Sequence, residues 1–171
     1  MKKVKFNKYL PELNEVLPGG LFLNVKTNNN FNTMTIGWAN AGIIWGLPIF
    51  NVAVRKSRYT YNLIEKTDEF TVSIPFSNRF KKELAFCGSR SGRNYDKIKE
   101  CGLNKIKAQS ISTPVIGGCD LHYECKIKYK QAMDSIYLNK SINKKYYKDN
   151  DYHTFYYGEI VDCYIDESIK I

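Results

Sequence analysis

The sequence lacks any apolar run near the roughly 18 residues that a helix needs to cross a bilayer. Its first ten residues, MKKVKFNKYL, carry the positive charge of a signal peptide, but no apolar stretch follows them. Metal-ligand patterns are missing too, because the five cysteines form no C-x-x-C pair and no Cys/His cluster at zinc spacing. We therefore expect a cytoplasmic chain with buried thiols, no membrane span and no metal site.

Signatures of dinucleotide, nucleic-acid and hydrolytic sites are absent as well. The chain has no G-x-G-x-x-G fingerprint, no serine–histidine–acid pattern and no paired carboxylates suited to hydrolysis. Its net charge of +9 raises the alternative of a basic nucleic-acid-binding barrel. The lysines are scattered, however, and no RNP-type, helix-turn-helix or KH signature accompanies them. We expect no nucleic-acid partner and interpret the charge as a solvated surface that attracts anionic nucleotides.

What the sequence does contain is a series of alternating runs. With 171 residues it is long enough for one domain, expected over residues 1–171, that buries about 70% of its unfolded surface. The expected strands, joined mostly by turns, lie near 21–25, 33–39, 50–54, 70–74, 121–130 and 152–165. This pattern predicts a mainly β fold with a few helices, arranged as an antiparallel barrel rather than a βαβ fold.

Three helices are predicted from residues that cap helix ends. Ser57 is expected to cap one helix, Ser77 or Asn78 a second, and Asn94 a short third helix closed by Gly102. All three are short, so strands dominate the expected fold.

Three other segments carry specific expectations. Residues 121–130 predict a half-buried strand that exposes His122. The apolar residues 43–45 are expected in the core, with contact in a homodimer as the alternative. Residues 134–151, rich in lysine, asparagine and tyrosine, are expected to form an excursion or a hairpin extension.

A cluster of cations and hydroxyls follows the strand expected at 50–54. The segment reads Arg55-Lys56-Ser57-Arg58-Tyr59-Thr60, with three cations and three hydroxyls at one helix start. Because the first turn of a helix also offers free backbone N–H groups, a phosphate is the expected occupant. An ordinary capped helix beside a solvated basic turn is the alternative.

The strand expected at 33–39 has two unlike faces. Met34, Ile36 and Trp38 share one face, whereas the residues between them are small or carry a hydroxyl. A flat ligand can lie close to such a backbone and use its N–H and C=O groups. The alternative is that the three bulky side chains fill the barrel interior.

The order of these motifs along the chain is similar to that of a known family. N-x-M-T-I-x-W, W-x-x-P, V-x-x-R-x-S-R-Y-T and F-T-V-S-x-P are followed by Cys87-Gly88, Ser91-Gly92-Arg93, Asp96-Lys97, and then His153 before Gly158-Glu159. From Gly19 to Asp162 the chain resembles the flavin reductase-like proteins of the flavoredoxin kind. The resemblance implies an FMN-binding split β-barrel, usually a homodimer, that passes electrons between a nicotinamide cofactor and flavin or another acceptor.

The same resemblance assigns residues to a cofactor site. It implies FMN-binding roles for Asn32, Met34, Thr35, Ile36 and Trp38 along the ring, for Arg55, Ser57, Arg58, Tyr59 and Thr60 at the phosphate, and for Cys87, Arg93 and Lys97 beyond them. It gives His153 the catalytic position near the nicotinamide or flavin edge, although Tyr152 stands where the family usually has an acid. The alternatives are a buried structural thiol at Cys87 and a strand-end histidine bonded to backbone.

The resemblance thus predicts an oxidoreductase that takes hydride from NADH or NADPH through FMN and reduces free flavin or another acceptor. An FMN-dependent electron carrier without direct nicotinamide turnover is the alternative. Two departures from the family stand out. Residues 134–151 look longer than usual, and the chain ends at Ile171, where relatives commonly continue, so ring cover from a tail is missing or comes from elsewhere.

Overall fold

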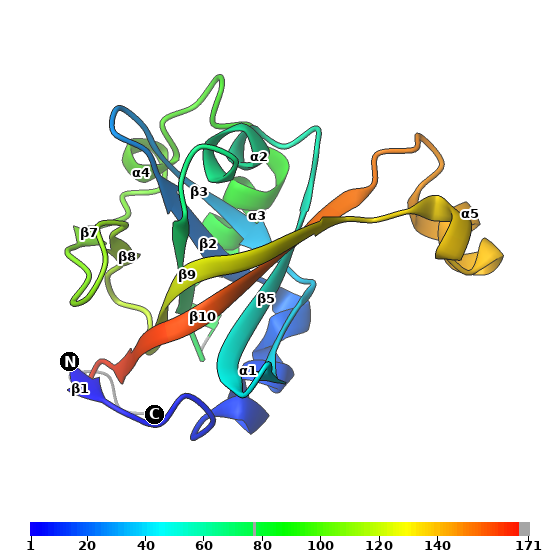
Figure 1. The fold of residues 1–171 in the computed structure, drawn as a ribbon. Helices are drawn as coiled ribbons and strands as arrows, with labels where there is room; N and C mark the ends of the chain where they lie inside the picture. The colour runs from blue at the N-terminus through cyan, green and yellow to red at the C-terminus, as the bar shows by residue number, and fades with distance from the viewer. Residues whose placement is uncertain (77, 168–171) are drawn as a thin grey trace.

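The computed structural model describes residues 1–76 and 78–167 (Figure 1). Its strands are β1 Lys2–Lys3, β2 Leu21–Lys26, β3 Phe31–Ile36, β4 Ala39–Ile44, β5 Leu47–Arg55, β6 Glu69–Ile74, β7 Lys105–Ile106, β8 Val115–Ile116, β9 Leu121–Ala132 and β10 His153–Ile165. Its α-helices are α1 Leu10–Val16, α2 Tyr59–Ile64, α3 Lys81–Ser89, α4 Lys97–Glu100 and α5 Lys140–Tyr146. Short 3₁₀ turns cover Leu17–Gly19, Asn78–Phe80 and Ser135–Tyr137.

The main sheet is antiparallel and curls into a split barrel. Its strands lie in the order β3-β2-β6-β9-β10-β5-β4, and β1 pairs with β10. Although β3 and β4 are consecutive in sequence, they lie at opposite ends of this order, so the connection between them crosses the open side of the barrel. There the Trp38 carbonyl accepts the Ala53 N–H at 3.3 Å. The expected mainly β fold with an antiparallel split barrel is confirmed.

The barrel interior is filled by alternate residues of several strands. Because neighbouring side chains of a strand point to opposite faces, one set from each strand meets inside. The fully buried members from β2, β5 and β6 are Leu21, Leu23, Val25, Phe50, Val52, Val54, Phe70, Val72 and Ile74. On the outer face of β2, Phe22 packs in a second cluster with Leu84 and Cys87 of α3. This outer cluster anchors α3 and, through Ile98, α4, whereas Leu63 and Ile64 of α2 belong to the barrel core (Figure 1).

β9 differs from the half-buried strand that its alternation predicts. Its first five residues are all buried, including His122 and Glu124. Glu124 accepts the backbone N–H groups of Gln109, Ser110 and Ile111, so the segment between β7 and β8 covers the outer face of the sheet here. The expectation that His122 is exposed is wrong. Its Nδ1 lies 3.1 Å from Ser73 Oγ, which also accepts the Ile116 N–H of β8, and its ring packs against Tyr164.

The helix starts also differ in detail from those predicted. The N-cap of α2 is Arg58 rather than Ser57, and it makes no side-chain cap. The N-cap of α4 is Asp96 rather than Asn94; its carboxylate accepts two backbone N–H groups. Gly102 closes that helix as expected, with φ of 59°, a conformation that favours glycine. The N-cap of α3 is Phe80 rather than Asn78, and it makes no side-chain cap. The alternative cap, Ser77, lies outside the described residues.

The strand predicted over 33–39 is two strands. β3 ends at Ile36, β4 begins at Ala39, and Gly37-Trp38 turns the chain between the two edges of the barrel. The core placement expected for residues 43–45 is wrong for two of them, because Ile43 and Trp45 are 61% and 60% exposed. The alternation alone did not reveal the break, because Trp38 continues the apolar pattern.

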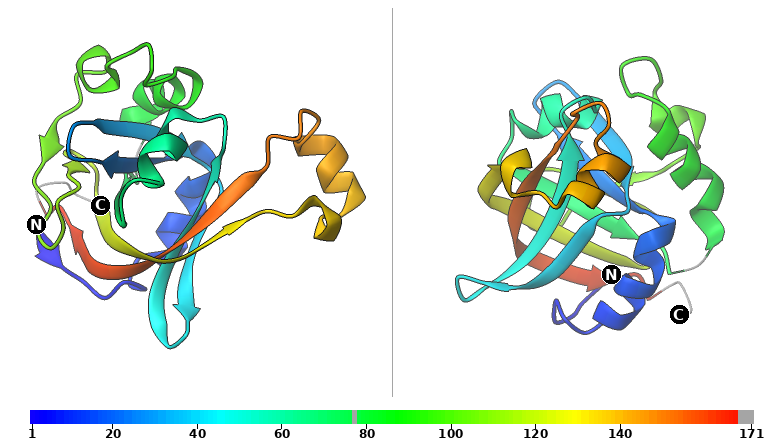
Figure 2. Two further views of the ribbon diagram at one scale, coloured as in Figure 1. Left: turned by 45° about the horizontal axis from the view of Figure 1, so that its top comes forward. Right: turned by 90° about the vertical axis from the view of Figure 1, so that its right-hand side faces the viewer.

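Residues 133–152 form the expected excursion between β9 and β10. Figure 2 shows this segment, with α5, standing away from the barrel. Its base contacts the barrel, whereas Ile136 and Tyr137 near its far end are mostly exposed.

One glycine in the barrel is required by close packing. β10 and β9 change register between Tyr157 and Gly158. A Cβ at Gly158 would lie 2.6 Å from the Phe70 ring and 2.8 Å from Cys125 Cβ. Gly42 in β4 is its contrast, because a Cβ there meets nothing within 4 Å.

We predict that Gly158→Ala lowers the free energy of unfolding by about 1–3 kcal/mol, the usual cost of overpacking a core. Gly42→Ala is the matched control, since it adds the same methyl group to an open site, and it is expected to leave stability within about 0.5 kcal/mol. Urea unfolding followed by circular dichroism measures both variants. Equal stability of the two variants would contradict the packing described.

Candidate functional site

A cationic cavity of about 110 Å³ lies between β3, the start of α2 and the end of α3. Its wall consists of Asn32, Met34, Ser57, Arg58, Tyr59, Thr60, Cys87, Gly88, Ser89, Arg90, Ser91, Gly92, Arg93 and Lys97. Four of these residues are basic, several carry hydroxyls, and none is acidic. Such a donor set suits an anion with several oxygen atoms.

A second cavity, of about 180 Å³, adjoins the first and is here called the aromatic cavity. Its wall consists of Met34, Thr35, Ile36, Gly37, Trp38, Ala53, Arg55, Arg58 and His153. Met34 and Arg58 line both cavities, so the two are neighbouring parts of one region. The structure therefore brings the sequence-predicted residues together, but divides them between two cavities.

The loop after α3 closes the cationic cavity by packing tightly on β3 and α2. A Cβ at Gly92 would collide with Asn32 Oδ1 and lie 2.8 Å from Tyr59. Asn32 itself donates to Thr60 Oγ1 at 2.7 Å, and Arg93 donates to the Ser57 carbonyl at 3.1 Å. Only glycine allows this close approach. The sequence motif Ser91-Gly92-Arg93 contains this glycine, but the sequence analysis assigned it no role in the site.

Lys97 and Cys87 lie in the wall of this cavity, as expected, but both are buried. The Lys97 ammonium donates to the carbonyls of Thr33 at 3.0 Å and Cys87 at 2.8 Å. Burial lowers the pKa of Lys97 from its ordinary value. Burial, with Cys101 beside it, raises the pKa of the Cys87 thiol to about 12, so this thiol stays protonated at neutral pH. Cys87 is therefore a buried packing group in this structure, which is the alternative stated for it above.

Arg55 lies outside the wall of the cationic cavity, and Ser57 lines that cavity but directs its donors to another residue. Arg55 lines only the aromatic cavity, and its guanidinium donates to the carbonyls of Asp151 and Tyr146. The Ser57 N–H and hydroxyl both donate to the Asp151 carboxylate, at 3.1 and 2.5 Å. Sequence reasoning missed Asp151 and Tyr146, because their approach depends on how the excursion folds back onto the barrel.

His153 lies in the aromatic cavity, opposite Arg55 in the β10–β5 pairing. Its Nδ1 is 2.8 Å from the Tyr147 hydroxyl, and its ring centroid is 4.8 Å from that of Trp38. Burial, and then the charge of Arg55, lower the pKa of His153 to about 4. At neutral pH this imidazole is therefore uncharged. Its side-chain partner is a tyrosine of the excursion rather than the backbone.

The remaining ring-site residues divide between core and cavity. Ile36 is 3% exposed and belongs to the barrel core, as expected for at least one member of this set. Thr35 donates to the Leu84 carbonyl at 2.6 Å and so connects β3 to α3. Trp38, in contrast, is 43% exposed and contacts Tyr146, Tyr147 and His153 through its ring.

Neither a metal cluster nor a membrane-spanning helix is found in the described part of the chain. No group of three or more His, Cys, Asp or Glu side chains is arranged to hold a metal ion there. No helix among residues 1–76 and 78–167 is long and apolar enough to cross a bilayer.

We predict that both histidines titrate near pH 4 in the folded protein. Burial lowers the pKa of His122 as it does that of His153. Since each folded pKa lies below the unfolded value of 6.5, the unfolded state binds more protons as pH falls. The stability from keeping these rings neutral is complete above pH 6.5 and is lost towards pH 4. NMR suits this test because the chain has two histidines; a ring titrating near 6.5 would contradict its described burial.

Several known proteins are similar to this chain in sequence or in fold. An uncharacterised protein of Archaeoglobus fulgidus is 28% identical over 96 residues, which cover 56% of this chain and 53% of that protein. The chain thus spans about half the length of the curated relatives it matches. Flavoredoxin of Desulfovibrio vulgaris (Miyazaki F) is 25% identical with a TM-score of 0.69, over 87% of this chain and 70% of flavoredoxin.

A further solved structure supports the fold alone. A Shewanella frigidimarina protein with a split barrel domain gives a TM-score of 0.69 at 16% identity, over 96% of this chain and 76% of the other.

The family described as flavin reductase like domain matches residues 19–170, which is most of the sequence. This chain therefore belongs to the flavin reductase like domain family, a family of flavin-related oxidoreductases.

Proposed function

We propose that this protein binds FMN and passes electrons from NADH or NADPH through it to free flavin or another acceptor. The observation that carries the proposal is a cationic, acid-free cavity that adjoins an aromatic cavity through Met34 and Arg58. FMN has this same division, with a phosphate at one end and a flat ring system at the other. Family membership and the likeness to flavoredoxin support the same conclusion.

The residues of the cationic cavity fit a phosphate group. Arg58, Arg90 and Arg93 supply guanidinium groups that bind phosphate oxygens in a fork, and the hydroxyls of the wall add neutral donors. Gly92 leaves the loop backbone close to the cavity, where a side chain would fill the space. We propose that these residues, rather than Arg55, hold the FMN phosphate.

The aromatic cavity suits the ring of the same cofactor. When bound, FMN supplies the electron-transfer chemistry, and the chain supplies binding, orientation and electrostatics. Met34 and Trp38 offer apolar cover, while His153 stays neutral and keeps its ring fixed against Tyr147. The flavin ring itself accepts the hydride, so the reaction needs no acid or base from the protein. Binding and orienting the ring are then sufficient roles for these residues.

The test starts from the visible spectrum of the purified protein after addition of FMN. We expect FMN to bind, and NADH or NADPH to bleach its absorbance under anaerobic conditions, with repeated turnover when free flavin is added. Bound FMN that is not bleached by either nicotinamide would favour the alternative of an electron carrier. No binding of FMN at all would overturn the proposed function.

We also propose a homodimer, a cytoplasmic location and a single domain. Trp45, Tyr129 and Tyr157 form an aromatic cluster with ring centroids 5.5–6.0 Å apart. Trp45 and Tyr129 are exposed, as is Ile43, whereas Tyr157 is half-buried. Apolar surface of this kind, at the β4 edge of the sheet, supports contact with a second copy. The five free cysteines support a reducing compartment.

We predict that Trp45→Asn shifts the protein from dimer to monomer. Asparagine tolerates the positive φ of 54° at this position, so the change removes the exposed ring without new backbone strain. Tyr137→Asn is the matched control, because it removes an exposed ring from the excursion, outside the cluster. Analytical ultracentrifugation measures both variants. A dimer unaffected by Trp45→Asn, or one lost equally in the control, would place the interface elsewhere.

A further inference from the structure

Arg55 is fixed at the end of β5 by groups of the excursion. Its guanidinium donates to the Asp151 carbonyl and to the Tyr146 carbonyl, each at 2.9 Å. It also lies 5.0 Å from the centroid of the Tyr147 ring. Three contacts from one segment hold the planar group in one orientation, although a quarter of the side chain is exposed.

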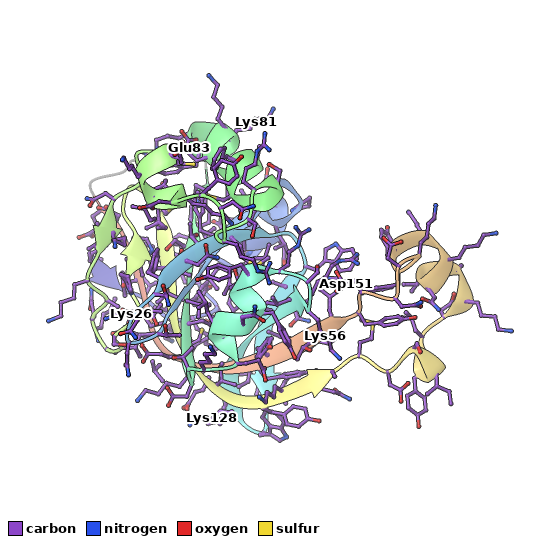
Figure 3. All side chains as sticks on the ribbon, turned by 90° about the horizontal axis from the view of Figure 1, so that it is seen from above. Lys26, Lys56, Lys81, Glu83, Lys128 and Asp151 are labelled. Atoms are coloured by element: carbon purple, nitrogen blue, oxygen red, sulfur yellow. The ribbon has the colours of Figure 1, made fainter. Side chains whose placement is uncertain are left out.

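The side chain of Asp151 also fixes the excursion to the barrel near Arg55. Its carboxylate accepts both the N–H and the hydroxyl of Ser57, two residues after Arg55. Asp151 therefore bonds the excursion to the loop that leads into α2, and it occupies the Ser57 donors that a phosphate would otherwise use. Figure 3 shows Asp151 where the excursion joins the barrel. The distance of 3.9 Å between Arg55 Nη1 and Asp151 Oδ2 adds an ion pair.

The position of Arg55 relative to the two cavities determines which part of a ligand it can reach. It lines the aromatic cavity and does not line the cationic one. Across the strand pair it faces His153, whose ring is neutral at pH 7. Arg55 and Arg58 are thus the only charged groups in the wall of the aromatic cavity within the described part of the chain.

We propose that Arg55 is a ring-side cation that favours the reduced flavin, and that Asp151 is the positioning residue that keeps it there. This inference rests on the proposed binding of FMN. When a nicotinamide donor is oxidised by transferring a hydride, the neutral flavin ring gains two electrons and one proton and becomes negatively charged. A fixed guanidinium in the ring cavity stabilises that charge, whereas a phosphate ligand would bind both oxidation states equally.

Two measurements on the FMN-loaded protein separate these roles. The first is the reduction potential of bound FMN, and the second is the affinity for FMN relative to riboflavin, which lacks the phosphate. For Arg55→Gln we expect a loss of about tenfold in the preference for reduced over oxidised FMN, which equals about 30 mV for a two-electron couple. The affinity ratio of FMN to riboflavin is expected to stay within about twofold, since the phosphate contacts remain.

Further variants serve as controls. Arg93→Gln is expected to lower the FMN-to-riboflavin ratio while leaving the potential unchanged, because Arg93 lines only the cationic side. Lys56→Gln removes an exposed charge next to Arg55 that lines neither cavity, and it is expected to change neither quantity. Arg55→Lys keeps the charge, so the reduction potential of bound FMN should stay close to that of the wild-type protein. Asp151→Ala keeps the backbone carbonyl that Arg55 donates to but removes the carboxylate that bonds this segment to Ser57. The guanidinium is then held less firmly, so the potential should fall in the same direction as with Arg55→Gln.

Arg55→Lys and Asp151→Ala also keep the test decisive if Arg55→Gln does not fold. The inference is overturned if Arg55 variants lower the FMN-to-riboflavin ratio as Arg93→Gln does and leave the potential unchanged. It is also overturned if Lys56→Gln shifts the potential as much as Arg55→Gln, because that would indicate a general charge effect. Wild-type protein that binds neither flavin would instead overturn the proposed function, and with it this inference.

Discussion

The pairing of β5 with β10 is the constraint on which the rest of the site depends. Its register sets His153 opposite Arg55, at the point where β5 ends and β10 begins. β5 continues through Ser57 into α2, and β10 is preceded by the excursion. Asp151, in the excursion, bonds these two segments through Ser57. A change of one residue in this register would move each side chain to the other face of the sheet and disassemble the aromatic cavity.

Because the barrel is not fully closed, the residues set by this register line a cavity instead of a packed core. A fully closed sheet would place a strand where Gly37 and Trp38 now cross between β3 and β4, and its interior would hold only core residues. The split instead leaves Trp38 partly exposed beside His153. The cationic cavity lies on the other side of Met34, where Gly92 lets the loop after α3 pack against β3. Charge and apolar surface are thus separated within one continuous region, which is the arrangement that a flavin nucleotide requires.

Much of this fold follows from sequence patterns, and the exceptions have physical causes. The alternation of β2, β5 and β6 predicted buried strands correctly, because each of them contributes one face to the barrel core. The burial of His122 was missed, because its neighbours Ser73 and Tyr164 come from other strands, which the alternation of its own strand does not reveal. The motifs identified Arg58 and Arg93 as neighbours. They did not separate Arg55 from them, since its orientation depends on carbonyl groups almost a hundred residues later, which no local pattern encodes.

The account as a whole depends on the cationic cavity holding the phosphate of FMN while the aromatic cavity holds its ring. A crystal structure of the protein with FMN bound measures this most directly. The account predicts phosphate oxygens in contact with Arg58 and with the loop that carries Gly92 and Arg93, the ring between Met34 and Trp38, and Arg55 still bonded to the carbonyls of Tyr146 and Asp151. A phosphate bound to Arg55, or a ring lying in the cationic cavity, would contradict it.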